Sequence, residues 1–280
     1  MALLSSFRSS LMKLSVAALL SAGVIAPAAH AFGVGVQPAT VEMTIKPGEN
    51  NRQTITLGNV HKEKTISLTI SLADWTLDEN GELILAPPGE NQRSAADWVR
   101  FSPAVVTLKP ETKQEISVEI TAPFKIKEKG DHRFALLATT RLPDDRGEAS
   151  GVWNKYQLAS LFYLTTLPSK SLPVIETQVV NNDSTNMVTM AIENEGDAHA
   201  RLKGHAIIKN KDGETVDKLP VSTVVLNHHK RKLGVNLSSS EKTVAGETYQ
   251  VDFDLKNSFA PQNKFKTTDV PAKSVTYIAK

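Results

Sequence analysis

The 280-residue chain contains no cysteine. This absence excludes disulfide bonds, thiolate nucleophiles, iron–sulfur clusters and zinc sites built on sulfur, so the fold must be stabilised by packing. A sustained helical stripe of apolar residues is also missing. Beyond the N-terminus, no apolar run approaches the roughly 20 residues that a membrane-spanning helix needs. These absences indicate a structural or binding protein rather than a multi-span membrane protein.

The usual motifs of enzyme chemistry are absent as well. The sequence has no Gly-x-Ser-x-Gly elbow, no phosphate-binding glycine loop and no His-Glu-x-x-His pair. Residues 78–82 resemble the start of a calcium loop, but the glutamate that closes a twelve-residue loop is missing. A catalytic triad can assemble from distant positions, yet the chain offers few histidines. We therefore expect no enzyme, no cofactor, no metal and no small-molecule substrate, and we place a polysaccharide-binding or hydrolytic role last.

The first 31 residues have the organisation of a signal peptide. Arg8 and Lys13 give a basic start, and an apolar run follows them. Small residues then occupy the positions that a signal peptidase reads, so we expect cleavage between Ala31 and Phe32 and export of the chain. A membrane anchor is the other interpretation, but the run is too short to span a bilayer. The start of the chain stays open between Met1 and Met12.

The net charge gives no reason to expect a polyanionic partner. The chain has 32 basic and 30 acidic residues. Removal of the two basic residues of the leader leaves 30 of each sign. Because nucleic acids are bound through an excess of basic residues, we expect no nucleic-acid partner.

The histidines and tryptophans each allow two interpretations. We interpret the histidines beyond residue 31 as surface or structural groups, because a metal site needs three or four convergent ligands. The tryptophans either form a ligand-stacking platform or, as we favour, pack in cores or interfaces, since each ring buries much apolar area. These residues are His61, His132, His199, His205, His228 and His229, together with Trp75, Trp98 and Trp153.

Apolar residues recur at every second position along most of the chain after the leader. The alternation is clearest in residues 66–72, 116–120, 233–237 and 249–255. A period of two puts one face of a strand in a core and the other in water. Turn residues separate such segments, at positions 78–81, 109–111 and 211–213, and one turn of helix is expected near 93–97. The pattern favours β-sandwiches.

The alternation changes phase near Pro38. Val34 and Val36 share one parity with Pro38, whereas Val41 and Met43 share the other. Because a shift of one residue turns every side chain to the opposite face, we predict that the chain passes from one sheet to the other here. A loop between two separate strands is the alternative.

Residues 167–173 are expected to connect two domains. The segment is bracketed by Pro168 and Pro173 and lacks alternation. Residues 32–166 and 174–280 then each have the size of one immunoglobulin-like sandwich. The predicted fold class is therefore all-β, with two tandem immunoglobulin-like β-sandwich domains after a cleaved signal peptide at residues 1–31.

A series of short motifs runs through the first of these domains. It comprises Gly33-Val34-Gly35-Val36-Gln37-Pro38, Thr40-Val41-Glu42-Met43, Lys46-Pro47-Gly48, Asp74-Trp75, Asn80-Gly81, the segment 94–103, Leu108-Lys109-Pro110 and Asp131-His132-Arg133-Phe134. In this order and spacing they resemble the N-terminal domain of the PapD-like periplasmic chaperones of chaperone–usher pilus assembly, especially their divergent branches. Residues 174–280 match only as a β-rich domain of suitable size.

The resemblance implies a periplasmic chaperone that binds pilus or fimbrial subunits and delivers them to an outer-membrane usher. Subunits of that family are incomplete sandwiches, and the chaperone lends an edge strand to their open groove. The implied lending strand is 152–165. The subunit-binding residues expected on it are Val152, Trp153, Tyr156, Leu158 and Ser160. An ordinary core strand is the other interpretation, and an edge strand can serve both roles.

The chain departs from the family where a subunit's terminal carboxylate is gripped. The family's arginine position falls near Glu42 or Met43 and its lysine position near Ser160, so neither is matched. The family's interdomain arginine is not found in residues 164–168. Anchoring in the cleft through Arg100, Arg133 or Lys155 is one alternative, and a different kind of ligand is the other.

A second function stays open because a fold does not fix a function. Tandem immunoglobulin-like modules also build structural or adhesive surface proteins. A free strand edge would in addition allow a self-capping homodimer when no client is present.

Overall fold

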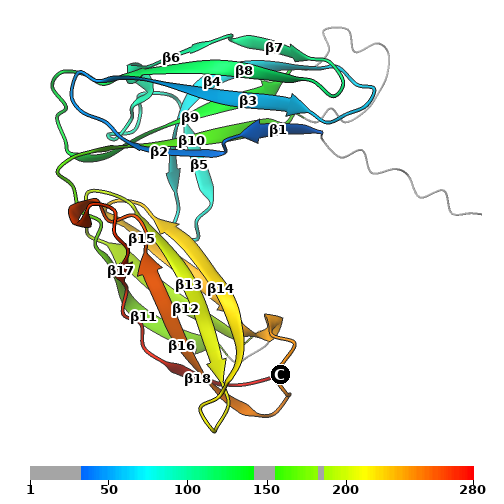
Figure 1. Ribbon diagram of the computed structural model, residues 1–280, viewed down its shortest axis with the longest axis vertical. Helices are drawn as coiled ribbons and strands as arrows, with labels where there is room; N and C mark the ends of the chain where they lie inside the picture. Colours follow the sequence, from blue (N-terminus) through cyan, green and yellow to red (C-terminus); the bar gives the residue numbers. More distant parts are fainter. Residues whose placement is uncertain (1–32, 142–154, 182–185) are drawn as a thin grey trace, which may run out of the picture. The chain divides into compact units, whose positions relative to one another are not determined.

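The computed structural model describes residues 33–141, 155–181 and 186–280 (Figure 1). The expected cleavage site at Ala31 and Phe32, and the candidate residues Val152 and Trp153, lie outside these ranges. In the described ranges no helix is long and apolar enough to cross a membrane. Secondary structure there consists of strands and three short 3-10 turns, which agrees with the predicted all-β class.

Strands β1 to β10 form the first sandwich from two sheets (Figure 1). One sheet has the order β1-β3-β8-β6, and the other has the order β2-β10-β9-β4-β5 with β7 also paired to β4. The strands are β1 (Val34–Gln37), β2 (Thr40–Thr44), β3 (Asn50–Asn59), β4 (Ile66–Leu77), β5 (Leu83–Ala86), β6 (Val99–Ser102), β7 (Val105–Leu108), β8 (Lys113–Thr121), β9 (Gly130–Thr140) and β10 (Gln157–Thr166).

Strands β11 to β18 form the second sandwich. Its sheets have the orders β11-β12-β15 and β14-β13-β16-β17, with β18 also paired to β16. A core that includes Met190, Ile192, Leu202 and Ile208 lies between them. The strands are β11 (Pro173–Asn181), β12 (Met187–Asn194), β13 (Ala200–Lys209), β14 (Thr215–Val225), β15 (His229–Asn236), β16 (Thr248–Asn257), β17 (Thr268–Asp269) and β18 (Val275–Ile278).

Burial follows the alternation in the sequence along most strands. In β12 every second residue is fully buried, and β8 repeats the pattern from Ile116 to Ile120. Strand β9 is the exception, because every residue from Gly130 to Ala138 is buried. One of its faces lies in the core of the first sandwich, and the other contributes Ala135 and Leu137 to a second apolar cluster.

The predicted turns are present. The Gly81 N–H donates to the Asp78 carbonyl oxygen at 3.0 Å, and the Glu82 N–H donates to the Asp78 carboxylate at 2.8 Å. Gly81 has φ +82°, a left-handed conformation that glycine adopts without steric cost. The expected turn of helix is a 3-10 turn at Ala96–Trp98, displaced by a few residues. The residues that form the hairpin turn were therefore predicted correctly from the sequence.

The predicted passage between sheets occurs at Pro38. Strand β1 pairs with β3 in one sheet, and β2 pairs with β10 in the other. Proline has no N–H to donate, so the ladder ends there and the chain can turn to a new partner. The change of parity in the sequence thus marks a change of sheet rather than a simple loop.

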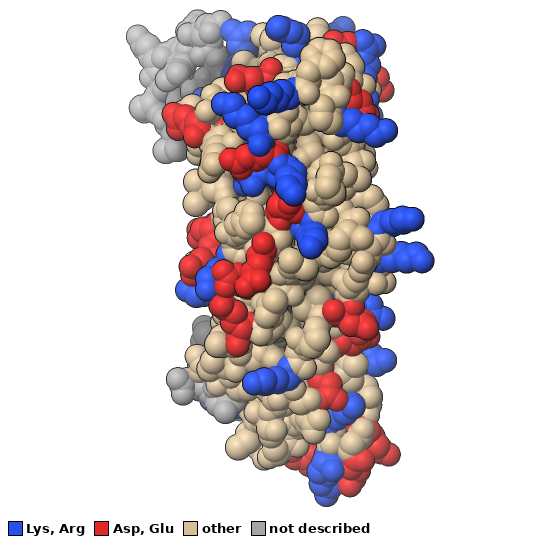
Figure 2. Space-filling model, turned by 90° about the vertical axis from the view of Figure 1, so that its left-hand side faces the viewer, with Lys and Arg blue, Asp and Glu red and all other residues tan. Residues whose placement is uncertain are grey.

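The segment between the sandwiches carries no strand. Strand β10 ends at Thr166 and β11 begins at Pro173. Charges of both signs are interspersed on the face drawn in Figure 2, as the balanced composition leads one to expect.

Candidate functional site: an edge strand next to a buried charge cluster

Strand β10 is paired unequally along its length. On one flank β9 pairs with all of it, from Gln157 to Thr166. On the other flank β2 pairs only with residues 161–165. Among the described strands, residues 157–160 therefore have a neighbour on one flank only, while residues 161–165 lie between two neighbours.

The start of β2 sets where the second flank becomes occupied. The Leu161 N–H donates to the Ala39 carbonyl oxygen at 2.9 Å, and the Ser160 hydroxyl donates to the Pro38 carbonyl oxygen at 2.7 Å. Before Pro38 the chain belongs to the other sheet. The passage between sheets thus leaves the first part of β10 at an edge.

Main-chain groups on this edge point outwards. Successive residues of a strand present their N–H and C=O groups to opposite flanks. Leu161 donates towards β2, whereas the Tyr156 carbonyl oxygen accepts from Thr140 on the β9 side. Gln157 and Ala159 have the parity of Leu161, so their N–H and C=O groups face the flank that no described strand occupies. These groups form a short template for an added strand.

The two faces of β10 differ in burial. Phe162 and Leu164 are fully buried in the first core, where Phe162 stacks on Phe134 with ring centroids 4.3 Å apart. Leu158 and Tyr156 share their parity, and Leu158 is half-buried while Tyr156 is 39% exposed. Leu158 therefore points towards the chain's own core. A charged substitution at Leu158 would test packing as well as binding.

The other face of β10 belongs to rows of side chains that cross three strands. The register aligns Thr69, Thr139 and Gln157 in one row and Ser71, Leu137 and Ala159 in the next. A third row contains Ala73, Ala135 and Leu161. Polarity therefore falls along this face, from hydroxyl and amide groups to apolar groups.

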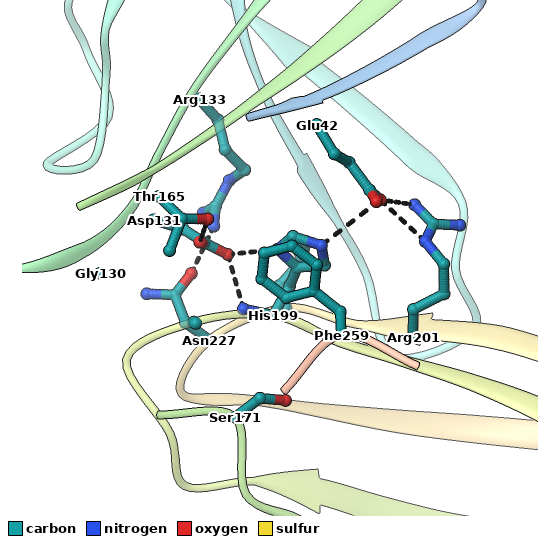
Figure 3. A network of polar contacts seen from close by, with 12 residues as sticks. Glu42, Gly130, Asp131, Arg133, Thr165, Ser171, His199, Arg201, Asn227 and Phe259 are labelled. Carbon is teal, nitrogen blue, oxygen red and sulfur yellow. Dashed lines mark hydrogen bonds and ion pairs between the residues drawn. The ribbon is translucent and has the colours of Figure 1, made fainter. Parts of the chain in front are cut away.

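A cluster of charged side chains adjoins the doubly paired end of β10, with a buried Asp131–His199 pair and the more exposed Glu42 and Arg201 beside it (Figure 3). The Asp131 carboxylate accepts from the His199 main-chain N–H at 2.6 Å and bonds to His199 Nδ1 at 2.7 Å. Its other oxygen accepts from the Thr165 hydroxyl at 2.6 Å. Glu42 lies 3.4 Å from His199 Nε2 and is bonded by the Arg201 guanidinium. The cluster joins strands β2, β9 and β10 to β13.

These contacts shift the pKa values of all three titratable groups. Burial opposes charge on His199, but Asp131 and Glu42 outweigh it and raise the pKa of His199. Burial likewise opposes charge on Asp131, but His199 and Thr165 hold the pKa of Asp131 below its usual range. Burial raises the pKa of Glu42, yet His199 and Arg201 lower it to about 2. At 3.4 Å the Glu42–His199 contact is electrostatic, because Nε2 of His199 makes no hydrogen bond.

Aromatic rings enclose the imidazole of this cluster. His199 stacks on Phe259 with centroids 3.9 Å apart, and Tyr163 lies 4.5 Å away on a tilted plane. Burial raises the pKa of Tyr163 to about 12, so this phenol stays neutral. The rings exclude water, which strengthens the charge pairs beside them.

Gly130 lies where β9 comes close to the second sandwich. A Cβ atom at this position would stand 2.0 Å from the Asp197 carbonyl oxygen, and the φ of Gly130 is +93°. The neighbouring Asp131 N–H donates to the same carbonyl oxygen at 2.9 Å. Only glycine fits this approach of two main chains.

The tip of the β4–β5 hairpin is a second contact with the second sandwich. The Lys232 N–H donates to the Glu79 carbonyl oxygen at 2.6 Å, and the two side chains form an ion pair at 2.8 Å. The Arg231 guanidinium also donates to that carbonyl oxygen and lies against Gly81. The hairpin thus contacts the second sandwich through a main-chain hydrogen bond and through an ion pair.

The structure separates the three candidate cleft anchors. Arg100 is exposed on β6, in the sheet that does not contain β10. Arg133 is 4% exposed, bonds Asn227 through its guanidinium and lies over the Trp75 ring, so it is committed within the protein. Lys155 is exposed just before β10. The three cations therefore do not form one anchor.

The expected strand residues are also distributed over different environments. Tyr156 and Leu158 lie in the part of the chain next to the free flank, and Ser160 is buried and bonded to Pro38. Two of the tryptophans support the packing interpretation. Trp75 is 1% exposed and donates to the Phe134 carbonyl oxygen, and Trp98 packs against His132.

Sequence reasoning missed the buried cluster. His199 was expected to be a surface or structural histidine, and it is structural, but its partners lie on strands far away in the chain. One signal was available: Asp131, His132 and Arg133 directly precede the apolar run 134–138 of the same strand, and charges in such a place need partners. The partners themselves could not be read from the sequence.

In the described part of the chain, no group of three or more His, Asp or Glu side chains could hold a metal ion. His199 is fully buried against Tyr163 and Phe259, so a substrate has no access to its imidazole. The accessible feature is the strand edge, which can bind another strand through its main chain.

No family model matches the sequence. No curated protein matches it either.

The solved structures to which this chain is similar include several pilus chaperones. One is the CsuC–CsuE chaperone–tip subunit pre-assembly complex of Acinetobacter baumannii archaic Csu pili, at 12% identity and TM-score 0.44, covering 85% of this chain and 97% of that one. Another is the Pseudomonas aeruginosa CupB2 chaperone, at 9% identity and TM-score 0.40, with coverages of 84% and 98%. A third is the E. coli chaperone DraB, at 9% identity and TM-score 0.42, with coverages of 86% and 97%. All three TM-scores lie below 0.5, so a function for this chain must rest on its own geometry.

Proposed function

We propose that this protein is a periplasmic chaperone for pilus or fimbrial subunits. The observation that carries the proposal is the flank of β10 at residues 157–160, which no described strand occupies, on a strand whose residues 161–165 are fixed between two neighbours. A subunit that lacks a strand can pair with this flank, gain main-chain hydrogen bonds and keep its core covered until it reaches an outer-membrane usher.

The fixed half of the strand supports this role. A lent strand must stay in place while its client binds and leaves, because ordering it anew on each occasion would cost conformational entropy. Residues 161–165 are held by β2, by β9 and by the Thr165–Asp131 hydrogen bond. The edge is thus pre-organised by the same strand that carries it.

The proposal is tested by substituting Ala159, whose N–H faces the free flank. Ala159→Pro removes this N–H but leaves the donors that face β9 intact, so the chain should still fold. Ala159→Ser keeps the N–H and is the matched control. In periplasmic extracts, the natural protein and Ala159→Ser should co-purify one-to-one with a small β-protein that is degraded in their absence. Ala159→Pro should lose this partner without a large change in melting temperature.

Two outcomes contradict the proposal. If Ala159→Pro still captures the small β-protein, binding does not use the strand edge. If the protein is recovered in the outer-membrane or extracellular fraction with no dependent partner, the structural or adhesive function applies. N-terminal sequencing of the purified protein should find Phe32 as the first residue if the expected cleavage occurs.

A further inference from the structure

A groove lies on the outer face of the sheet, at the end where the free flank of β10 begins. Its volume is about 500 Å³. It is lined by Thr69, Ser71, Thr139, Thr140, Arg141, Lys155 and Gln157. These side chains are hydroxyls, one amide and two cations, and none of them is acidic.

The two cations of the groove are exposed and unpaired among the described residues. Neither Arg141 nor Lys155 takes part in an ion pair there. The main chain of Arg141 is nevertheless fixed, because its N–H donates to the Ser67 carbonyl oxygen at 2.9 Å. The groove thus has two positively charged side chains, and the main chain of one of them, Arg141, is held in place by a hydrogen bond.

Other cations near β10 are already committed. Arg133 is buried and bonded to Asn227, and Arg201 is paired with Glu42. Arg100 lies in the other sheet. Within the ranges that the structure describes, Arg141 and Lys155 are therefore cations that remain available to a strand added beside residues 157–160.

The rows of side chains determine which part of an added strand would meet these cations. A strand that pairs with the free flank extends each row by one residue, because side chains directly opposite each other share a face. Its residue beside Gln157 would stand at the groove, whereas residues beside Ala159 and Leu161 would continue the apolar rows.

We propose that the groove is a subsite for an acidic side chain of the client strand. The client would place an aspartate or glutamate in the row of Gln157, within reach of Arg141 and Lys155, and apolar residues in the two rows that follow. This rests on the proposed function, and it adds a charge requirement and a register to it. Charge-assisted hydrogen bonds from two cations would favour the acid over its neutral amide.

The test uses short fluorescent peptides of alternating valine and threonine, acetylated and amidated so that their ends carry no charge. One set has a glutamate near the first position and another near the last, because the strand direction is open; each has a glutamine counterpart. At low ionic strength, one glutamate peptide should bind about fivefold more tightly than its glutamine counterpart, which corresponds to about 1 kcal/mol. Fluorescence anisotropy measures both affinities.

Variants of the protein locate the effect. The double variant Arg141→Gln, Lys155→Gln should remove the preference for glutamate and leave binding of the glutamine peptide unchanged. Arg100→Gln with Lys113→Gln, an equal loss of charge on the other sheet, should keep the preference. Persistence of the preference in the first double variant, or equal binding of both peptides to the natural protein, would overturn the subsite.

Failure of the strand-addition function has a different signature. If strand addition is wrong, Ala159→Pro will not weaken binding of either peptide. If strand addition is right but the subsite is wrong, Ala159→Pro will weaken both peptides equally, and charge will have no effect in any variant. A preference that appears only after Asp144, Asp145 and Glu148 are neutralised would identify the chain's own loop as the occupant and would also overturn the proposal.

Discussion

The two halves of β10 differ in how their flanks are paired. Residues 161–165 lie between β9 and β2, with Phe162 and Leu164 in the core and Thr165 bonded to Asp131. Among the described strands, residues 157–160 pair with β9 alone, and their outward face is polar at its start. The alternation of side chains is continuous through both halves. The difference comes from where β2 begins, and Pro38 sets that point.

The largest expected effect separates the halves by packing. Phe162→Ala should destabilise the protein by about 3–5 kcal/mol, because the ring is fully buried and its removal leaves a cavity. Leu158→Ala should lower the free energy of unfolding by only about 1 kcal/mol, since this side chain is half-buried. Urea unfolding followed by circular dichroism measures both. Equal losses would show that residues 157–160 are as well anchored as the rest.

The second expected effect concerns pH and acts on the fixed half. The pKa of His199 is raised in the folded protein, so its contribution to stability is complete below about pH 6.5 and is lost as pH rises through the folded pKa. The pKa values of Asp131 and Glu42 are lowered, and that of Glu42 is about 2. Their contribution is present above about pH 4.5 and is lost as pH falls. Stability should therefore be greatest between these limits.

His199→Asn is the variant that isolates the alkaline limb of this curve. Asparagine can keep a hydrogen bond to Asp131 but does not titrate, so the loss of stability above about pH 6.5 should become smaller. The free energy of unfolding in urea, measured from pH 4 to pH 9, provides the comparison. An unchanged alkaline limb would mean that His199 carries no charge in the folded protein.

The smallest effect requires no substitution. The N–H groups of Gln157 and Ala159 face the free flank, whereas the Leu161 N–H donates to Ala39. Amide exchange at 157 and 159 should therefore be fast, and exchange at 161 should be slow, although all three residues belong to one strand. Hydrogen exchange followed by NMR resolves them. Protection of 157 and 159 that grows with protein concentration would indicate the self-capping homodimer.

Much of the fold follows from local patterns in the sequence. The alternation predicts the strands, and the turn residues Asp78 and Gly81 predict the hairpin between β4 and β5. The shift of parity around Pro38 predicts the passage between sheets. Each of these features depends on residues that are neighbours in the chain, which is why sequence alone reveals them.

The charge cluster could not be predicted in the same way. His199 and Asp131 are 68 residues apart, and Arg201 and Glu42 are 159 apart. From the sequence Arg133 looked available to a ligand, but its guanidinium donates to Asn227 and lies over the Trp75 ring. Whether a charge is free or committed depends on what the fold brings beside it, and the periodicity of a strand contains no information about that.

The lack of a side chain at Gly130 affects more than the main chain of this residue. Asp131 can reach His199 only because the backbone before it lies directly against the carbonyl group of Asp197. A methyl group at position 130 would clash with the Asp197 carbonyl oxygen and push the two main chains apart. The Asp131 carboxylate would then move away from the His199 imidazole. Glycine at position 130 thus sets the main-chain spacing that the contact between Asp131 and His199 requires.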